Sequence, residues 1–391
     1  MKRGLADLDV NGRRVFVRAD LNVPLDGSAI RDDSRIKASL PTIRDLRDRG
    51  ARVVLASHLG RPRGAVRPEL SLAPVAERLG EFLGASVPVA PDSMGPEVER
   101  LTRELVDGDV LLLENVRFHP GEEANEPDHV RALAGLADCY VNDAFGTAHR
   151  AHASTTGLAH ALPAAAGHLM LAELHALDPI VQGPPRPFAA IVGGAKISDK
   201  ITLLERLAAT ADLLILGGAM ANTFLAADGV GIGRSRAESA AEAVARIRSA
   251  ADAVGCRLVL PVDAVVADAA ADDAAPATVG LDAVPTDAMI LDIGPASLAA
   301  YAEALARART VLWNGPVGVY ELAPFATGTL GLARLLAHLP AEVVVAGGDA
   351  VAAAQASGRA EDFAHLSTGG GATLELIEGR ELPGVAALPE A

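Results

Sequence analysis

The sequence predicts an α/β protein with two domains, each built on a mainly parallel sheet. Short runs rich in Val, Ile and Leu alternate with longer stretches of helical periodicity, a pattern typical of repeated βα units. This layout occurs twice, on either side of a proline-rich segment over residues 178–187. A helical stretch over residues 165–177 precedes that segment, and a helix followed by a stiff linker is typical of a domain joint.

The expected strands follow one another with helical stretches between them. In the first half they lie within residues 13–20, 51–62, 109–118 and 138–150. In the second half they lie within residues 188–196, 212–220, 257–266, 288–295, 310–321 and 342–350, with clear helical stretches at 199–211 and 238–255. The tail, residues 380–391, is too short for a domain, and we expect it to dock on a surface elsewhere.

Composition excludes several classes of protein. The chain has 391 residues and a net charge of −15, which disfavours nucleic acid or an acidic membrane as the main partner. No apolar run reaches the length of a membrane span, and the first residues lack the apolar region of a signal peptide. Cys139 and Cys256 each lie in an apolar, strand-like run, which suits a reducing compartment. We therefore expect a soluble cytoplasmic protein.

Polar and basic residues follow the strands of the first half. Ligands of open α/β sheets bind at the carboxyl ends of the strands, so these positions are informative. Arginine binds phosphate and carboxylate through a bidentate fork, so several arginines at strand ends predict a small, doubly anionic substrate. The alternative for any single arginine is a surface ion pair. The candidates are Asp20, Asn22, Arg35, His58, Arg61, Arg117 and Arg150.

Glycine and lysine follow the first strand of the second half, in IVGGAKISDKITLLERL. The chain has only four lysines against 31 arginines, yet Lys196 and Lys200 both lie in this segment. We expect Ser198 to be a helix N-cap with Lys200 in the first turn, where a cation opposes the helix dipole by about 0.3–1 kcal/mol. A bound phosphate would reverse that cost. The alternative is a pair of solvent-exposed lysines.

Three further segments suggest groups for phosphate and metal. Asp349 follows a strand and two glycines, and one carboxylate is what Mg²⁺ usually takes from a protein when phosphates and water supply the rest; a plain N-cap is the alternative. Gly369, Gly370 and Gly371 open a helical stretch and leave its backbone amides accessible to an oxyanion, unless they form a flexible hinge. Asn314 and Glu321 give a weaker signal, for phosphate and ribose hydroxyls. The Walker A pattern and the G-x-G-x-x-G fingerprint are both missing, so a nucleotide site here needs another design.

Taken in order, eight segments resemble the phosphoglycerate kinase family over nearly the whole chain. They are VRADLNVP, SHLGRP, LLENVRFHPGEE, VNDAFGTAHRAHAS, GGAKISDK, WNGPVGVYE, GGDA and STGGGATLELIEG. The resemblance implies two Rossmann-like domains joined by a hinge helix, and Mg²⁺-dependent phosphoryl transfer between 1,3-bisphosphoglycerate and ADP in glycolysis. It also implies a monomer, while the net charge is what argues against a nucleic-acid or membrane partner. The domains would be residues 1–168 for 3-phosphoglycerate, residues 169–375 for nucleotide with the hinge helix at the start, and residues 376–391 returning to the first domain.

The resemblance also implies roles for individual residues. The 3-phosphoglycerate site would be Asp20, Asn22, Arg35, His58, Leu59, Gly60, Arg61, Arg117 and Arg150. The nucleotide site would be Gly193, Gly194, Lys200, Asn314, Glu321, Gly347, Gly348, Asp349 and Ala350, with Asp349 at the metal. The catalytic groups would be Arg35, Lys196, Gly369, Gly370 and Gly371. Ala350 departs from the family, which commonly has Ser or Thr there, and this puts one nucleotide contact in doubt.

Two other classes stay open at this point. A dinucleotide-dependent oxidoreductase would also have two α/β domains, but it should carry the missing glycine-rich fingerprint. A non-catalytic nucleotide-binding or scaffold protein would not need Lys196 and Arg35 together with Asp349.

Overall fold

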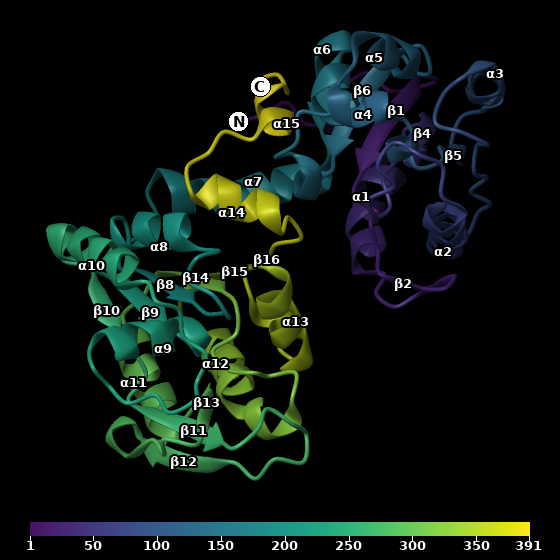
Figure 1. Ribbon diagram of the computed structural model, residues 1–391. Helices are drawn as coiled ribbons and strands as arrows, with labels where there is room; N and C mark the ends of the chain where they lie inside the picture. The colour runs from purple at the N-terminus through teal and green to yellow at the C-terminus, as the bar shows by residue number, and fades with distance from the viewer. The chain divides into compact units, whose positions relative to one another are not determined.

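The chain forms two compact units in the computed structural model, which describes residues 1–391. The first unit comprises Met1–His175 and Arg380–Ala391, and the second comprises Ala176–Gly379. Helix α7 (His168–Gln182) runs from the first unit into the second (Figure 1). The expected linker is therefore wrong for residues 178–182, which are the end of α7. The helix continues through Pro179 because that residue removes only one hydrogen bond, while its neighbours Leu177 and Ile180 are buried.

A five-stranded parallel sheet forms the centre of the first unit, in the order β5-β4-β1-β6-β7. Its strands are β1 (Arg14–Ala19), β4 (Arg52–Ala56), β5 (Val110–Leu112), β6 (Cys139–Asp143) and β7 (Ala164–Ala166). The helices are α1 (Ser34–Asp48), α2 (Ala73–Leu83), α3 (Pro96–Glu104), α4 (Pro120–Ala124), α5 (Pro127–Ala134), α6 (Leu158–Ala161) and α15 (Pro383–Ala386). A short hairpin, β2 (Leu25–Asp26) and β3 (Ala29–Ile30), lies between β1 and α1 in sequence. The sheet is buried, so its strands show continuous apolar runs, as the sequence pattern predicted.

A six-stranded parallel sheet forms the centre of the second unit, in the order β10-β9-β8-β14-β15-β16. Its strands are β8 (Phe188–Val192), β9 (Leu213–Leu216), β10 (Arg257–Val259), β14 (Thr310–Asn314), β15 (Glu342–Ala346) and β16 (His365–Leu366). The helices are α8 (Ile201–Ala208), α9 (Gly218–Ala227), α10 (Ala241–Val254), α11 (Pro295–Leu305), α12 (Thr327–Ala337), α13 (Gly348–Ala356) and α14 (Gly371–Ile377).

A separate antiparallel sheet of three strands belongs to the second unit. It has the order β12-β11-β13, formed by β11 (Asp263–Ala267), β12 (Ala277–Gly280) and β13 (Met289–Ile293). The apolar run over residues 257–266 is therefore two strands in different sheets, and Pro261 lies at the break between them. The run over residues 288–295 likewise pairs antiparallel, because an apolar run indicates a buried strand without identifying its neighbour.

The C-terminal segment packs within the first unit. Lys2 Nζ donates to the carbonyl of Leu388 at 2.8 Å, and Arg3 N donates to Pro389 at 2.9 Å. Gly384 N donates to the carbonyl of Ala148 at 2.8 Å. The two ends of the chain are consequently adjacent, as Figure 1 shows.

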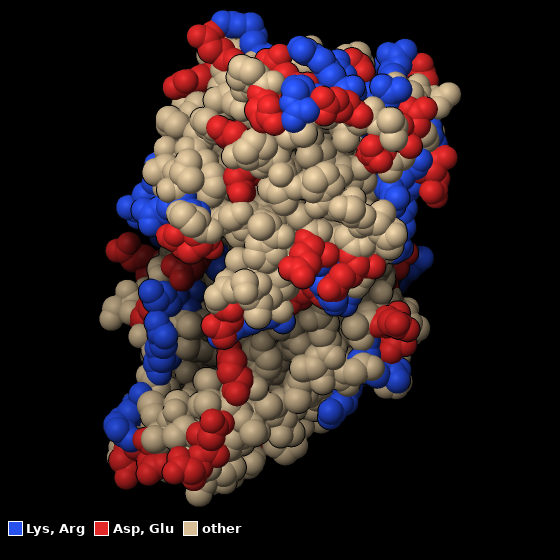
Figure 2. Space-filling view, turned by 90° about the vertical axis from the view of Figure 1, so that its right-hand side faces the viewer, with Lys and Arg blue, Asp and Glu red and all other residues tan.

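Three features bear on the expectations from composition: the surface charges, the apolarity of the helices and the state of the cysteines. Acidic and basic side chains are interspersed on the face drawn in Figure 2. None of the helices combines the length and the apolarity that crossing a membrane requires. Cys139 and Cys256 are buried free thiols, and burial raises the pKa of each to about 11.

Candidate functional site

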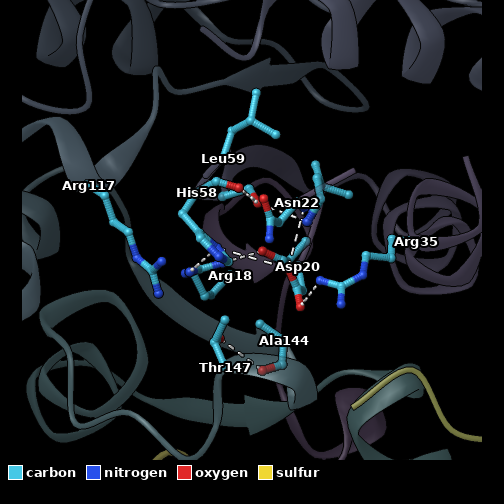
Figure 3. A network of polar contacts seen from close by, with 12 residues as sticks. Arg18, Asp20, Asn22, Arg35, His58, Leu59, Arg117, Ala144 and Thr147 are labelled. Carbon is cyan, nitrogen blue, oxygen red and sulfur yellow. Dashed lines mark hydrogen bonds and ion pairs between the residues drawn. The ribbon is translucent and has the colours of Figure 1, made fainter. Parts of the chain in front are cut away.

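A polar network lies at the carboxyl ends of β1 and β4 in the first unit (Figure 3). Asp20 follows β1, and its Oδ2 accepts a hydrogen bond of 2.6 Å from Arg35 of α1. Asn22 accepts a hydrogen bond of 2.9 Å from the backbone N–H of Gly60. His58 follows β4, with Nδ1 3.9 Å from Asp20 Oδ1. The network thus connects two neighbouring strand ends through side chains that the sequence had singled out.

Several of the arginines line a cavity of about 460 Å³ in the first unit. Arg117 is buried, donates to the carbonyl of Gly60 at 3.3 Å and lies 3.4 Å from Glu123. Burial lowers the pKa of Arg117, and the charge of Arg18 lowers it further. Arg61 and Arg150 make no ion pair, and Arg150 Nε donates to His149 Nε2 at 3.0 Å. Neither charge is therefore neutralised by an acidic group, which leaves both for an external anion. The lining residues are Arg61, Arg63, Arg117, Glu123, Arg150 and His152.

The strand ends of the second unit approach one another closely. A Cβ on Gly193, after β8, would overlap the carbonyl oxygen of Pro316. Gly315 has a φ of +91°, and a Cβ there would lie 2.5 Å from the carbonyl oxygen of Gly193. Glycine is therefore required here for the packing of the β8 and β14 ends, in addition to any contact with a ligand.

Lys200 is held at this junction. Its Nζ donates to the carbonyl of Gly193 at 2.9 Å and to Asn314 Oδ1 at 2.6 Å. Asn314 is buried and also donates to the carbonyl of Ala346 at 2.8 Å. Burial lowers the pKa of Lys200 to about 8, although the charges of Asp349 and Asp199 oppose that shift. The ammonium is thus positioned by neutral oxygens, with no carboxylate bonded directly to it.

The expected helix cap at Ser198 is wrong. Helix α8 begins at Ile201 with Lys200 as its N-cap residue, so Lys200 precedes the first turn. Ser198 instead bonds Glu238: its N–H donates to one carboxylate oxygen at 2.9 Å and its hydroxyl to the other at 2.8 Å. The Glu238 carboxylate thus takes the hydrogen bonds of Ser198. Glu238 lies 40 positions away in sequence, so a local sequence pattern does not predict this contact. Lys196 is exposed between β8 and α8.

A cavity of about 400 Å³ lies next to these strand ends. Its lining is largely apolar and combines loops that follow β8, β9 and β14 with residues of the three-stranded sheet. Gly194, Gly218, Val317, Glu321 and Asp349 line it, as do residues that the sequence did not single out: Asn222, Leu281, Met289, Leu291, Pro316 and Val319. A mostly apolar wall with a few polar groups is typical of a small-molecule site.

Asp349 and Ala350 lie in the first turn of helix α13 but have different surroundings. Gly347 is the N-cap, and Asp349 is exposed in the first turn with no cap hydrogen bond. The plain N-cap interpretation of Asp349 is therefore wrong. Ala350 is fully buried in the apolar core of the second unit. The methyl group of Ala350 therefore packs in the core and is not available to a ligand.

The three glycines precede and begin α14, as the sequence pattern predicted. Gly371 is its first residue, and Gly370 is the N-cap with a φ of +52°, which favours glycine. The N–H of Gly369 donates to Ser367 Oγ at 3.2 Å, and Ser367 Oγ lies 2.6 Å from Thr373 Oγ1. A Cβ on Gly370 would meet nothing within 4 Å, so the space beside this backbone is open.

Sequence reasoning missed Arg18, Arg63, Glu122 and His152 in the first unit. Arg18 is the fifth residue of the buried strand β1 and is fully buried. A charged residue inside an otherwise apolar strand was the available signal, since arginine is almost never fully buried without a partner. Glu122 and His152 lie away from the strand ends, and only tertiary packing brings them close.

Comparisons with known proteins agree with one another. The family model described as Phosphoglycerate kinase matches residues 5–380. Phosphoglycerate kinase of Moorella thermoacetica is 53% identical over all of this chain and 99% of its own length, and the cytosolic one of Triticum aestivum is 52% identical over 99% and 98%. A solved phosphoglycerate kinase structure from Coxiella burnetii superimposes with a TM-score of 0.90 at 40% identity, covering 99% of this chain and 98% of that one. The chain belongs to the phosphoglycerate kinase family.

Proposed function

We propose that this chain catalyses reversible phosphoryl transfer from 1,3-bisphosphoglycerate to ADP, giving 3-phosphoglycerate and ATP. The observation that carries the proposal is the arginine-lined cavity of the first unit, in which Arg61 and Arg150 have no acidic partner. A small molecule with a phosphate and a carboxylate would supply anionic partners for these arginines. The family membership of the whole chain supports the same reaction.

The first unit would bind 3-phosphoglycerate. Arg61, Arg117 and Arg150 would hold the phosphate. The glycerate hydroxyl would donate a hydrogen bond to Asp20, and the Asn22 side-chain NH₂ would donate one to the substrate. His58, Leu59 and Gly60 would contribute the loop after β4, whose backbone is already fixed by Asn22 and Arg117. Arg35 would lie at the carboxylate to which the phosphoryl group is transferred.

The second unit would bind the nucleotide. The apolar cavity beside Gly194 would take the base, and Glu321 would accept hydrogen bonds from ribose hydroxyls. Lys200 would contact the phosphates from its position beside Asn314, and the Gly347–Ala350 backbone would contribute N–H groups at the start of α13.

Mg²⁺ fits the residues present. Asp349 is an exposed carboxylate on the wall of the cavity, with no hydrogen bond to another protein group. The structure has no cluster of three or more metal-ligating side chains. A single carboxylate suits Mg²⁺ bound to substrate phosphates and water. When bound, the ion would neutralise phosphate charge, and Asp349 would hold it at the start of α13.

Catalysis would rest on positioning and on neutralising charge. When ATP phosphorylates 3-phosphoglycerate, the acceptor is a carboxylate that is already ionised at neutral pH, with a pKa of roughly 4, so no general base is required. Arg35, Lys196 and the N–H groups of Gly369–Gly371 would share the charge of the moving phosphoryl group. The two reactants are assigned to different units, so they must be brought in line and shielded from water during transfer.

A coupled assay with ATP, Mg²⁺ and 3-phosphoglycerate tests this function directly. Formation of ADP that depends on 3-phosphoglycerate is the expected result. An absence of turnover, with nucleotide binding intact, would favour a scaffold protein instead. We place this activity in the cytoplasm and expect a monomer, which sedimentation analysis can check.

A further inference from the structure

A chain of buried polar groups leads from Glu122 to His58, behind the arginine-lined cavity of the first unit. Glu122 and Arg18 are fully buried, and so is Ser154 in the helical turn Ala153–Gly157. None of the three belongs to the substrate contacts proposed above. Burial of a carboxylate and a guanidinium costs several kcal/mol each unless they are paired.

Ser154 connects the two charges. Its hydroxyl donates to Glu122 Oε1 at 2.6 Å and accepts from Arg18 Nε at 2.8 Å. The N–H of Ser154 donates to the second oxygen, Glu122 Oε2, at 3.0 Å. Both oxygens of Glu122 therefore accept hydrogen bonds from Ser154. Glu122 does not contact Arg18 directly, but it fixes the orientation of the guanidinium through the Ser154 hydroxyl.

Arg18 in turn contacts His58. One guanidinium NH₂ group lies 3.2 Å from His58 Nδ1, and the other donates to the carbonyl of Ala19 (Figure 3). A guanidinium only donates, so His58 Nδ1 must accept and cannot carry a proton. The ring is then the neutral tautomer with its proton on Nε2.

We propose that Glu122 and Ser154 are positioning residues for substrate binding: through Arg18 they hold His58 as a neutral imidazole that presents Nε2–H to the substrate. This inference rests on the proposed function, because it takes 3-phosphoglycerate as the ligand of His58. Binding of the anion costs less free energy when the donor is already fixed in one tautomer, because no second tautomer has to be depopulated.

The charges around His58 favour the neutral ring. Burial lowers the pKa of His58 well below the ordinary value, and the charges of Arg18, Arg117, Arg35 and His152 lower it further. Asp20, with Oδ1 3.9 Å away, is the acidic group that faces the ring and opposes this. His152 is neutral near pH 7, because burial lowers its pKa to about 3. Three arginines therefore outweigh one carboxylate that is itself bonded to Arg35.

Ring-nitrogen NMR of the full-length protein tests the proposal without substrate. The signals of His58 among the ten histidines are assigned with His58→Gln. The wild type should show an unprotonated Nδ1 and a protonated Nε2. Ser154→Ala should move both signals toward those of a tautomer mixture, and Ser154→Thr, which retains the hydroxyl, should restore them. Glu122→Gln, which removes the charge at constant size, should move them in the same direction as Ser154→Ala.

Kinetics provide the second measurement. Ser154→Ala should raise the KM for 3-phosphoglycerate about tenfold, as expected when the hydrogen bond from His58 Nε2 to a charged ligand is weakened, and leave the KM for ATP unchanged. Tyr140→Phe is the matched control: the Tyr140 hydroxyl donates to the carbonyls of Ser154 and Thr155 and is buried, but it lies outside the chain to Arg18. It should leave both the ring signals and the KM unchanged.

Three results would overturn the proposal. They are wild-type ring signals in folded Ser154→Ala, an equal shift in Tyr140→Phe, or an altered tautomer with an unchanged KM for 3-phosphoglycerate. If the wild type has no kinase activity, the proposed function fails, whereas the ring signals still decide whether the buried chain sets the state of His58.

Discussion

Nucleotide binding should draw a proton into the site, because Lys200 is half-buried without a directly bonded carboxylate. Burial lowers its pKa to about 8, against an ordinary value of 10.5. Phosphate oxygens placed beside the ammonium stabilise its charged form and raise that pKa again. At pH 9 only about one tenth of the free protein carries the proton on Lys200, so binding should take up roughly 0.9 proton; at pH 7 the uptake should fall to about 0.1.

Calorimetric titration with ADP at pH 9, in two buffers of different ionisation enthalpy, measures this uptake directly. The phosphates of ADP are fully deprotonated at that pH and add no proton of their own. Lys200→Met should abolish the difference between the buffers and weaken binding. Lys196→Met, which removes an exposed ammonium from the same loop, should retain the difference. Equal heats in both buffers for the wild type would refute the role assigned to the half-buried ammonium.

Four further outcomes follow from the geometry. Lys196→Ala should lower kcat by orders of magnitude with little change in KM, and a near-normal kcat would remove this residue from the mechanism. Arg61→Ala should raise the KM for 3-phosphoglycerate roughly tenfold to a hundredfold and spare that for ATP; the reverse pattern in steady-state kinetics contradicts the assignment. Gly193→Ala should lower Tm by several degrees because its methyl group overlaps a neighbouring carbonyl, whereas Gly348→Ala has open space and should not; equal melting curves would count against this packing. Burial lowers the pKa of His129 to about 4, below its ordinary 6.5, so the unfolded state binds the proton first as pH falls. The free energy of unfolding of the first unit should therefore fall by about 2 kcal/mol between pH 6.5 and 4.5, and His129→Asn should lack this contribution. Chemical denaturation of both proteins at both pH values measures it, and an equal fall in the two proteins would contradict the prediction.

The strands and their order along the chain were predictable from sequence because buried parallel strands are short, continuous apolar runs. Strand β7 escaped this reasoning, since three alanines over Ala164–Ala166 carry no strand preference and only pairing with β6 defines them. The antiparallel pairing of β13 was not predictable either, because the sequence of a strand does not show which strand it pairs with.

The arrangement of the candidate site was predictable where its residues lie just after a strand. Asp20 and His58 follow β1 and β4 in this way. Lys200 is the N-cap of α8 and contacts the end of β8 only through Gly193. Arg18 and Glu122 were not predictable in this way, because both depend on contacts with Ser154, which is 136 positions from Arg18 and 32 from Glu122.

The second unit is inserted into the first, because residues 380–391 return to pair with the beginning of the chain. During synthesis, residues 176–379 therefore emerge and can begin to fold before the last contacts of the first unit exist. The contacts of Lys2 with Leu388 and Glu390 cannot form until these two residues, which are among the last to be synthesised, have left the ribosome. A premature stop that removes only this tail would thus damage the half of the protein that was made first.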